Sequence, residues 1–494
     1  MYEFIKERLS LSDEKTFLEM FLLLYALVSA VSFLLTPYAL IPIILIPVLF
    51  LTILKPEIFL ALTFLTVYIQ HTALKFMFSA GDIMEYPIYM IFLFLTLISW
   101  ILKKAIHKET KRQISPLDAP LLIIFLAETI TLLWTPNLEL GLHFFAMLTC
   151  NAITFYLITA IVNDEKSLKN AVITIAVSTF IIIISVIVSK YYVKRIDMTL
   201  AKGVTLGFFG IEQVDKRPMG LAGGPPASEL IVMVILVFAP IGFRYKGLKN
   251  NLFFIATLSA FYAIGIMAVR SALAAAIIGI ILLIYLHPRT REKFIRNALK
   301  YVVSIGLVVV FLTPGFIDRV LMGFGYTEKL WFTPTKTPAS TEFLSSSTQG
   351  VAGVNTRWLI WKSGFKHFAE NPYTVLVGIG MSGFVYISKY TATETHGLVL
   401  SFLFDMGLIG IVLFLYLLWK IVYSMKEIYK RMDGSLTADI ALGSVVSVIA
   451  VLGVDELVWG DLTSVSSRYS WYVLAFLAAS YNVLKNKQLT HTDN

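Results

Sequence analysis

The chain has 494 residues, of which 57% are hydrophobic and 15% are charged, and its mean hydropathy is +0.77. Soluble domains carry about 25% charged and 45–50% apolar residues, so this composition excludes a soluble enzyme and a disordered protein. The single cysteine, Cys150, excludes a disulfide scaffold. The formal net charge of +9 does not indicate nucleic-acid binding, because the basic residues fall between apolar segments. The sequence therefore predicts an all-α, polytopic membrane protein.

The apolar segments are long enough to cross a hydrocarbon core about 30 Å thick. We expect a single transmembrane domain over 1–494 with about 14 helices, in a range of 12–14. In chain order the expected spans are 17–36, 38–54, 57–78, 83–102, 117–134, 140–162, 168–190, 227–243, 251–269, 271–286, 300–315, 397–419, 436–454 and 469–484. The two spans on either side of Arg270 form either one kinked element or a tight hairpin.

Basic clusters between the spans predict the orientation. Lys103–Arg112, Arg289–Lys300 and Lys420–Arg431 all fall on one side, which the positive-inside rule assigns to the cytoplasm together with both termini. The long loops 190–226 and 316–396 then face the extracytoplasmic side of the plasma (inner) membrane.

Two arginines are candidates for binding an anion. Arg217 precedes a Gly/Pro-rich stretch that ends where span 227–243 begins, and helix N-termini favour phosphate groups. From this segment alone, an ordinary Gly/Pro loop with a solvated arginine is the favoured alternative. Arg270 lies within or at the edge of an apolar segment, where an arginine is costly and usually has a function or a partner. The alternative for Arg270 is snorkelling to the outer interface.

His396 stands just before span 397–419, and Glu394 lies two residues away. A histidine can take a proton from an attacking hydroxyl at neutral pH, and Glu394 would orient or tune it. A structural histidine at a loop–helix junction is the alternative. We expect no metal site, because the seven histidines are scattered and no cluster has ligand spacing.

Residues 355–370 predict an amphipathic helix within the second long loop. Trp358, Trp361, Phe365 and Phe368 share one face, Lys362 and Lys366 point away, and Arg357 borders the aromatic edge. This helix would lie in the membrane interface, floor a cavity for a lipid-linked ligand, or be a lid packed for stability alone. The following stretch 378–383 is rich in glycine but lacks the βαβ context of a nucleotide-binding fingerprint. Acidic residues in or near spans, which would serve a proton path or simply be paired, are Glu128, Asp405, Asp455 and Glu456.

In this order the motifs resemble the O-antigen ligase and O-antigen polymerase superfamily of membrane glycosyltransferases, most strongly over 217–486. The motifs are Arg217-Pro-Met-Gly, Arg270-Ser, Asn-Thr-Arg357-Trp-Leu-Ile-Trp361, Phe368-Ala-Glu-Asn-Pro372, Gly378-Ile-Gly380, Thr395-His396, Asp405-Met-Gly-Leu-Ile-Gly410 and an aromatic span around Trp471. The family commonly has His-Asn where this chain has His396-Gly397.

The resemblance implies transfer of a preassembled glycan from a polyprenyl (undecaprenyl) diphosphate carrier to a glycolipid, glycan or protein hydroxyl. Such a reaction belongs to lipopolysaccharide and polysaccharide biosynthesis in the cell envelope, needs no cofactor or metal, and inverts the anomeric carbon. Arg217 and Arg270 would neutralise the diphosphate, and His396 would activate the acceptor. Arg357, Glu394, Trp358 and Trp361 would bind substrate or support the loop.

Three alternatives remain open at this stage. Within the superfamily, a polymerase uses a second lipid-linked glycan as acceptor, and we favour the ligase. A transporter or flippase of lipid-linked sugars would also have many spans, but the long loops and the lack of a visible repeat speak against it. A structural scaffold leaves Arg270 and the ordered motifs unexplained.

Overall fold

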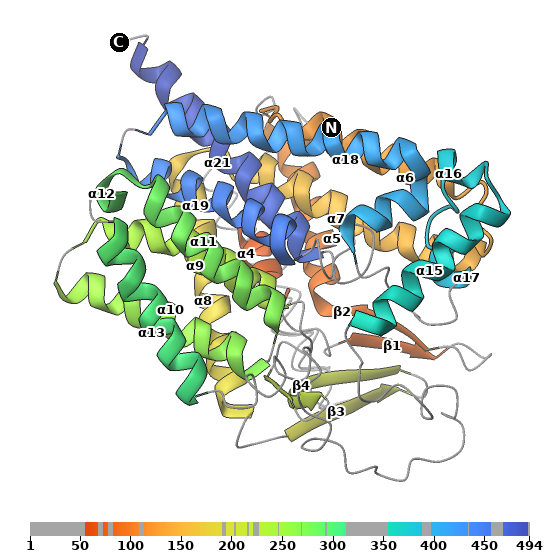
Figure 1. The fold of residues 1–494 in the computed structure, drawn as a ribbon, viewed down its shortest axis with the longest axis horizontal. Helices are drawn as coiled ribbons and strands as arrows, with labels where there is room; N and C mark the ends of the chain where they lie inside the picture. The colour runs from red at the N-terminus through yellow and green to blue at the C-terminus, as the bar shows by residue number, and fades with distance from the viewer. Residues whose placement is uncertain are drawn as a thin grey trace, which may run out of the picture.

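The computed structural model of the protein shows a helical bundle with one small sheet (Figure 1). It describes residues 55–67, 73–77, 83–107, 113–189, 194–201, 204–214, 217–220, 227–245, 247–267, 269–291, 294–312, 354–387, 397–432, 434–455 and 468–492. The predicted spans 17–36 and 38–54 lie outside these residues, so the expected count of 14 stays a prediction.

The helical fold class is confirmed for the described residues. The helices are α4 (Pro56–Thr66), α5 (Ile88–His107), α6 (Asp118–Thr131), α7 (Leu138–Ile161), α8 (Glu165–Ser189), α9 (Ala227–Phe243), α10 (Leu248–Met267), α11 (Arg270–Leu286), α12 (Pro288–Arg291), α13 (Phe294–Leu312), α15 (Val354–Glu370), α16 (Thr374–Val377), α17 (Gly383–Ile387), α18 (Leu398–Lys430), α19 (Leu436–Ala450) with a π-helical turn η3 (Val451–Asp455), and α21 (Arg468–Thr492).

Five helices in the described part are long and apolar enough to cross a membrane. They cover Leu138–Ile161, Glu165–Ser189, Asn250–Met267, Leu398–Lys430 and Leu436–Val454. Local sequence explains several boundaries: Asn137 caps α7 by accepting a hydrogen bond from the backbone N–H of Leu140 (3.0 Å), and Ser435 caps α19 in the same way.

The sequence did not predict the sheet. Its strands are β1 (Ala73–Met77), β2 (Ile83–Pro87), β3 (Lys194–Ala201), β4 (Val204–Val214) and β5 (Arg217–Gly220). They pair antiparallel in the order β2-β1-β4-β3, with β5 on β4. The predicted span 57–78 is therefore wrong in extent: α4 ends at Thr66, and the later residues of this segment include β1. Likewise, the start of the predicted span 83–102 is β2. Apolar runs with β-branched and aromatic residues are compatible with strands as well as with spans, which explains the error.

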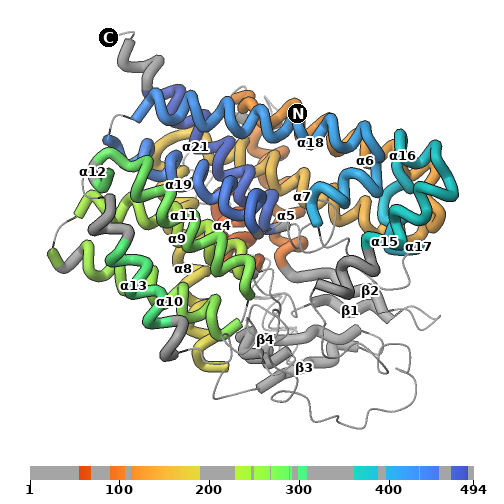
Figure 2. Tube along the Cα trace, in the orientation of Figure 1, coloured from red at the N-terminus to blue at the C-terminus, as the bar shows by residue number. Residues whose placement is uncertain are grey.

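The helices α10 and α11 form a tight hairpin, which decides between the two alternatives left open by the sequence. The Phe243 ring, at the end of α9, contacts both His287 after α11 (centroids 5.5 Å apart) and Tyr301. Phe254, near the start of α10, also contacts Tyr301 (5.1 Å). The start of α10 thus lies beside the end of α11, and the chain reverses between Met267 and Arg270. Figure 2 shows α9, α10, α11 and α13 grouped on one side of the bundle.

The long helix α18 is broken at Gly407 (φ 66°), and the glycine-rich segment 378–383 seals the break. The N–H groups of Ile379 and Gly380 donate to the carbonyl oxygens of Phe404 (2.6 Å) and Asp405 (3.2 Å). On its other side, the segment is bound to α6 and its C-terminal end: Thr131 Oγ1 accepts from the Met381 N–H, and Thr135 Oγ1 donates to the Met381 carbonyl (both 2.8 Å). The glycines in this segment therefore allow close backbone packing, a structural role.

We predict that Gly378→Ala destabilises the protein and that Gly306→Ala does not. Gly378 has a positive φ of 81°, and a Cβ there would overlap the carbonyl oxygen of Asp405. A positive φ combined with the extended ψ of −178° is a conformation found essentially in glycine alone, and it costs other residues about 1–3 kcal/mol. Gly306, within α13, has open space around it, and alanine favours a helix by about 1 kcal/mol. Thermal unfolding of the purified variants in detergent measures both effects, and equal midpoints would contradict this account of the break.

Candidate active site

Arg270 is the first residue of α11 and is exposed to solvent. It follows Val269, whose backbone is extended (φ −92°, ψ 98°), at the turn of the α10–α11 hairpin. The sequence placed this arginine within or at the edge of a span, and the structure places it at the edge. The guanidinium therefore lies at the N-terminus of an apolar helix, where the helix dipole and free N–H groups favour an anion.

Three helices begin at this end of the bundle, which we call the Arg270 end. Leu236 contacts Gly279, and Leu236 stands as far along α9 as Gly279 stands along α11. The parallel helices α9 and α11 consequently begin at the same level. The hydroxyl of Ser470, in the first turn of α21, is 3.3 Å from Glu229 Oε2 in the first turn of α9. The positive ends of three helix dipoles therefore lie together at the Arg270 end.

Polar side chains are buried in these first turns, although the surrounding helices are apolar. The fully buried Ser228, Glu229 (7% exposed) and Ser470 lie in α9 and α21, and Ser271 (8% exposed) follows Arg270. A carboxylate at a helix N-terminus is stabilised by the dipole, which accounts for Glu229. The sequence reasoning did not single out these residues as site residues. The signal that would have indicated Glu229 is an acidic residue at the start of a long apolar segment.

The helix α19 ends at the same level in the π-helical turn η3, Val451–Asp455. The hydroxyl of Ser447, one turn earlier, is 3.3 Å from the carbonyl oxygen of Met233 in α9, and η3 packs against α11. Turns of this kind occur frequently at functional sites. The backbone of Asp455 is thereby placed near the start of α11, whereas Glu456 lies outside the described residues.

Arg217 is the first residue of β5, opposite Val214 of β4. The strand β5 packs against α8 and α10, and the chain continues from it to the start of α9. The backbone of Arg217 is therefore held beside two of the helices that form this part of the bundle. The sequence predicted an irregular loop here, whereas residues 217–220 form a short strand, and 221–226 lie outside the described residues.

Two of the predicted site residues, His396 and Glu394, lie outside the described residues. The neighbouring Gly397 precedes α18, which starts at Leu398. The far end of α18 brings Tyr429 beside Pro288 and Arg291 of α12, at the opposite end of the bundle from Arg270. The N-terminus of α18 is thus directed away from α12.

The predicted amphipathic helix is present as α15, and its aromatic face is packed against protein. Trp361 and Phe368 contact a cluster formed with Ile379, Phe384 and Phe404, in which the Phe384 and Phe404 rings stack at 4.5 Å. Phe365 stays 43% exposed at the edge of this cluster. Lys362 and Lys366 point outward, as the sequence predicted. Arg357 and Trp358 lie in the first turns of α15.

Among the described residues, no three His, Cys, Asp or Glu side chains lie close enough together to hold a metal ion. Two of the acidic residues that the sequence singled out are buried: Glu128 is 1% exposed on α6, and Asp405 is 2% exposed beside the break in α18.

Comparison with protein-family models finds that residues 252–415 match one family model, O-antigen ligase. This segment is similar to O-antigen ligases over the matched residues. It is about a third of the chain and extends from α10 through α15 to the middle of α18. The matched segment includes Arg270, Arg357, Glu394 and His396, whereas Arg217 lies before it. The resemblance expected from the sequence is therefore confirmed. A search of curated proteins gave no match.

We predict that Phe368→Ala destabilises the protein far more than Phe365→Ala. Both rings lie on the same face of α15, but Phe368 is 7% exposed and Phe365 is 43% exposed. Truncating a buried phenylalanine costs about 3–5 kcal/mol. Thermal unfolding combined with limited proteolysis within 354–370 separates the two variants. If α15 is loosened equally by both, the aromatic face is not held by the Phe384–Phe404 cluster.

Proposed function

We propose that the protein is an O-antigen ligase-like glycosyltransferase. It moves a preassembled glycan from a polyprenyl-diphosphate carrier to an acceptor hydroxyl on a glycolipid, glycan or protein. The observation that carries the proposal is Arg270, which lies within the matched segment and stands where α9, α11 and α21 begin together. A site of this kind attracts a diphosphate at the edge of the apolar part of the bundle.

The reaction needs a group that stabilises the leaving diphosphate. As the acceptor oxygen bonds to the anomeric carbon, the bond from that carbon to the diphosphate oxygen breaks, and negative charge develops on the phosphate. Arg270 and the free N–H groups of α11 would stabilise this charge without a metal. Arg217, at the start of β5, would contact the same group, and Arg357 would hold the donor or the loop.

The acceptor hydroxyl also loses a proton, which we assign to His396. An imidazole that takes the proton as the oxygen attacks is a general base, and attack opposite the leaving group inverts the anomeric carbon. Glu394 would orient His396. Trp358 and Trp361 would bind the glycan or the lipid near the first turns of α15.

We further propose that the Arg270 end faces the extracytoplasmic side. The basic residues Arg291, Lys420 and Lys430 lie in the elements α12 and α18 that meet at the opposite end, and cytoplasmic loops are rich in lysine and arginine. The donor would then be used on the outer face of the plasma membrane.

The transfer assay uses purified protein in detergent, a polyprenyl-diphosphate oligosaccharide and candidate acceptors, with EDTA and without nucleotide sugar. We expect wild type to transfer the glycan, and Arg270→Ala and His396→Ala to lose about a hundredfold or more of the rate. Lys366→Ala is the control, since it removes an exposed positive charge (75% exposed side chain) from α15. A single addition to the acceptor indicates a ligase, and a ladder of products indicates a polymerase.

Transfer that persists in Arg270→Ala would contradict the diphosphate assignment. Movement of the lipid across sealed liposomes without any transfer would instead favour a transporter.

The orientation is tested by labelling with a membrane-impermeant maleimide. Cys150 is 6% exposed and buried in α7, so the wild type gives a low background. We expect Arg270→Cys to react in cells whose plasma membrane is intact and whose outer barrier is removed. Lys430→Cys, whose native side chain is 71% exposed, should react only after the membrane is permeabilised. The reverse pattern would invert the proposed topology.

A further inference from the structure

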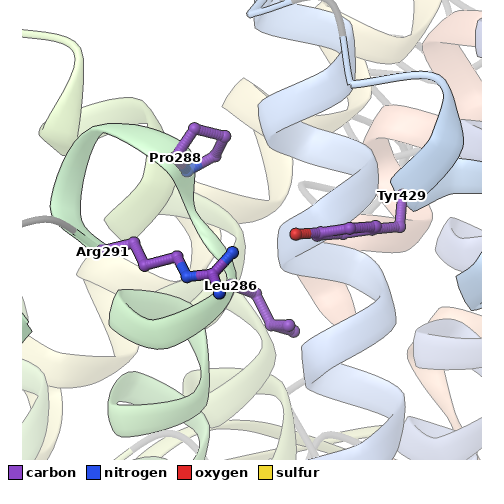
Figure 3. Close-up of a pocket in the computed structure, with 4 residues that line it drawn as sticks. All are labelled: Leu286, Pro288, Arg291 and Tyr429. Carbon is purple, nitrogen blue, oxygen red and sulfur yellow. The ribbon is translucent and has the colours of Figure 1, made fainter.

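A pocket of about 460 Å³ lies at the end of the bundle opposite Arg270, which we call the α12 end. Leu286, Pro288 and Arg291 line it from the end of α11 and from α12, and Tyr429 lines it from the last turn of α18. Figure 3 shows the Arg291 guanidinium and the Tyr429 hydroxyl directed toward each other across the pocket, with Leu286 between and below them. Because a helix rises 1.5 Å per residue, α11 separates this pocket from Arg270 by about 25 Å. It is therefore a different site from the one proposed for the donor.

Arg291 and Tyr429 are the polar side chains among the described residues that line the pocket, and both are available to a ligand. Within the described part of the chain, Arg291 pairs with no carboxylate, and its guanidinium lies 5.6 Å from the centre of the Tyr285 ring. The neighbouring basic residues differ, since Lys430 and Arg431 both contact Glu427 at 3.1 Å. An arginine and a phenol that converge on one space offer several N–H donors and one O–H donor to phosphate oxygens.

The wall of the pocket is held rigidly by a buried polar network. Asp439 in α19 contacts Arg244 after α9 (3.1 Å) and His287 (3.3 Å), and His287 stands between the pocket residues Leu286 and Pro288. The side chains of Asp439 and His287 are 2% and 3% exposed. Thr290 Oγ1 adds hydrogen bonds to the carbonyl oxygens of Ile284 (2.9 Å) and His287 (3.2 Å). The turn from α11 into α12 is thus fixed before any ligand binds.

The pocket continues a surface that is suited to lipid. Large exposed side chains form a stripe along one face of α18 that reaches the pocket at its last residue. The stripe consists of Leu408, Val412, Leu415, Trp419, Val422 and Tyr429. On α11 the exposed Ile278 and Tyr285 share a face below Arg291. Lys420 lies over the Trp419 ring, 4.4 Å from its centre. Tryptophan, tyrosine and lysine side chains at the end of an apolar stripe are typical of the part of a membrane protein that lies in the headgroup region of the bilayer.

We propose that this pocket binds the phosphate of an anionic phospholipid headgroup. Arg291 and Tyr429 would bind the phosphate oxygens, and Leu286, Pro288 and the exposed stripe of α18 would contact the start of the acyl chains. The apolar approach from the stripe favours a lipid over a soluble phosphate. This inference does not depend on the proposed transferase activity or on the orientation of the chain.

The test is native mass spectrometry of the full-length protein in a neutral detergent. Phosphatidylglycerol and phosphatidylcholine with identical acyl chains are titrated against wild type, Arg291→Ala and Tyr429→Phe, with folding checked by thermal unfolding. We expect wild type to retain one phosphatidylglycerol selectively, and Arg291→Ala to weaken this binding by about fivefold or more, as expected for the loss of one arginine contact. Tyr429→Phe should weaken it to a smaller extent while preserving the ring. If Arg291→Ala does not fold, Tyr429→Phe alone decides, since it removes only the hydroxyl of a surface side chain.

Lys430→Ala is the matched control. It removes one positive charge beside Tyr429, but its side chain does not line the pocket and is 71% exposed. Selective binding that survives Lys430→Ala and falls in Arg291→Ala supports a built site. Equal losses in both variants, or no preference for phosphatidylglycerol, overturn the proposal in favour of general surface attraction. Displacement of the lipid by millimolar inorganic phosphate would overturn the lipid as the ligand, because the phosphate alone would then suffice.

Discussion

In a bundle of apolar helices, helical hydrogen bonds use every backbone N–H group except those of the first turn of each helix. This constraint confines polar chemistry to the ends of the helices. At the Arg270 end, α9, α11 and α21 begin at one level, so the free N–H groups of three first turns lie where Arg270 supplies a full positive charge. At the α12 end, Arg291 lines the pocket beside the helix termini that Asp439, His287 and Arg244 hold together. The two ends therefore present two cationic sites separated by an apolar layer.

Close backbone packing holds the helices that define these ends. Glycine permits it in two places: Gly279 of α11 and Gly443 of α19 both lie against Leu236 or its backbone in α9. A second device is the break in α18, whose freed carbonyl groups receive the N–H groups of Ile379 and Gly380. Through this contact the family-matched segment joins its outer helices α15–α17 to the core. These close contacts therefore fix the positions of the helices that carry the site, although the glycines themselves are not site residues.

The sequence predicted the bounds of most helices in the second half of the chain closely, because a long apolar run between charged or capping residues is compatible only with a helix. Span 227–243 coincides with α9, and the helix expected at 355–370 is α15. It did not predict the sheet, since the apolar run 57–78 contains both α4 and β1. Arg270 was found as a charge in an apolar context, but its grouping with Glu229 and Ser470 depends on which helices run parallel. The network of Asp439 was missed for the same reason: its three residues are far apart in the chain.

The most direct test of the account is photo-crosslinking with a polyprenyl diphosphate that carries a diazirine beside the first phosphate. Mass spectrometry of the digested protein then identifies the labelled peptides. The account predicts labelling in the first turns of α9 and α11, around 227–230 and 270–273, which excess unlabelled diphosphate lipid abolishes. Labelling confined to 286–291 and 426–430, or spread evenly along the lipid-facing stripe of α18, would contradict a diphosphate site at the Arg270 end.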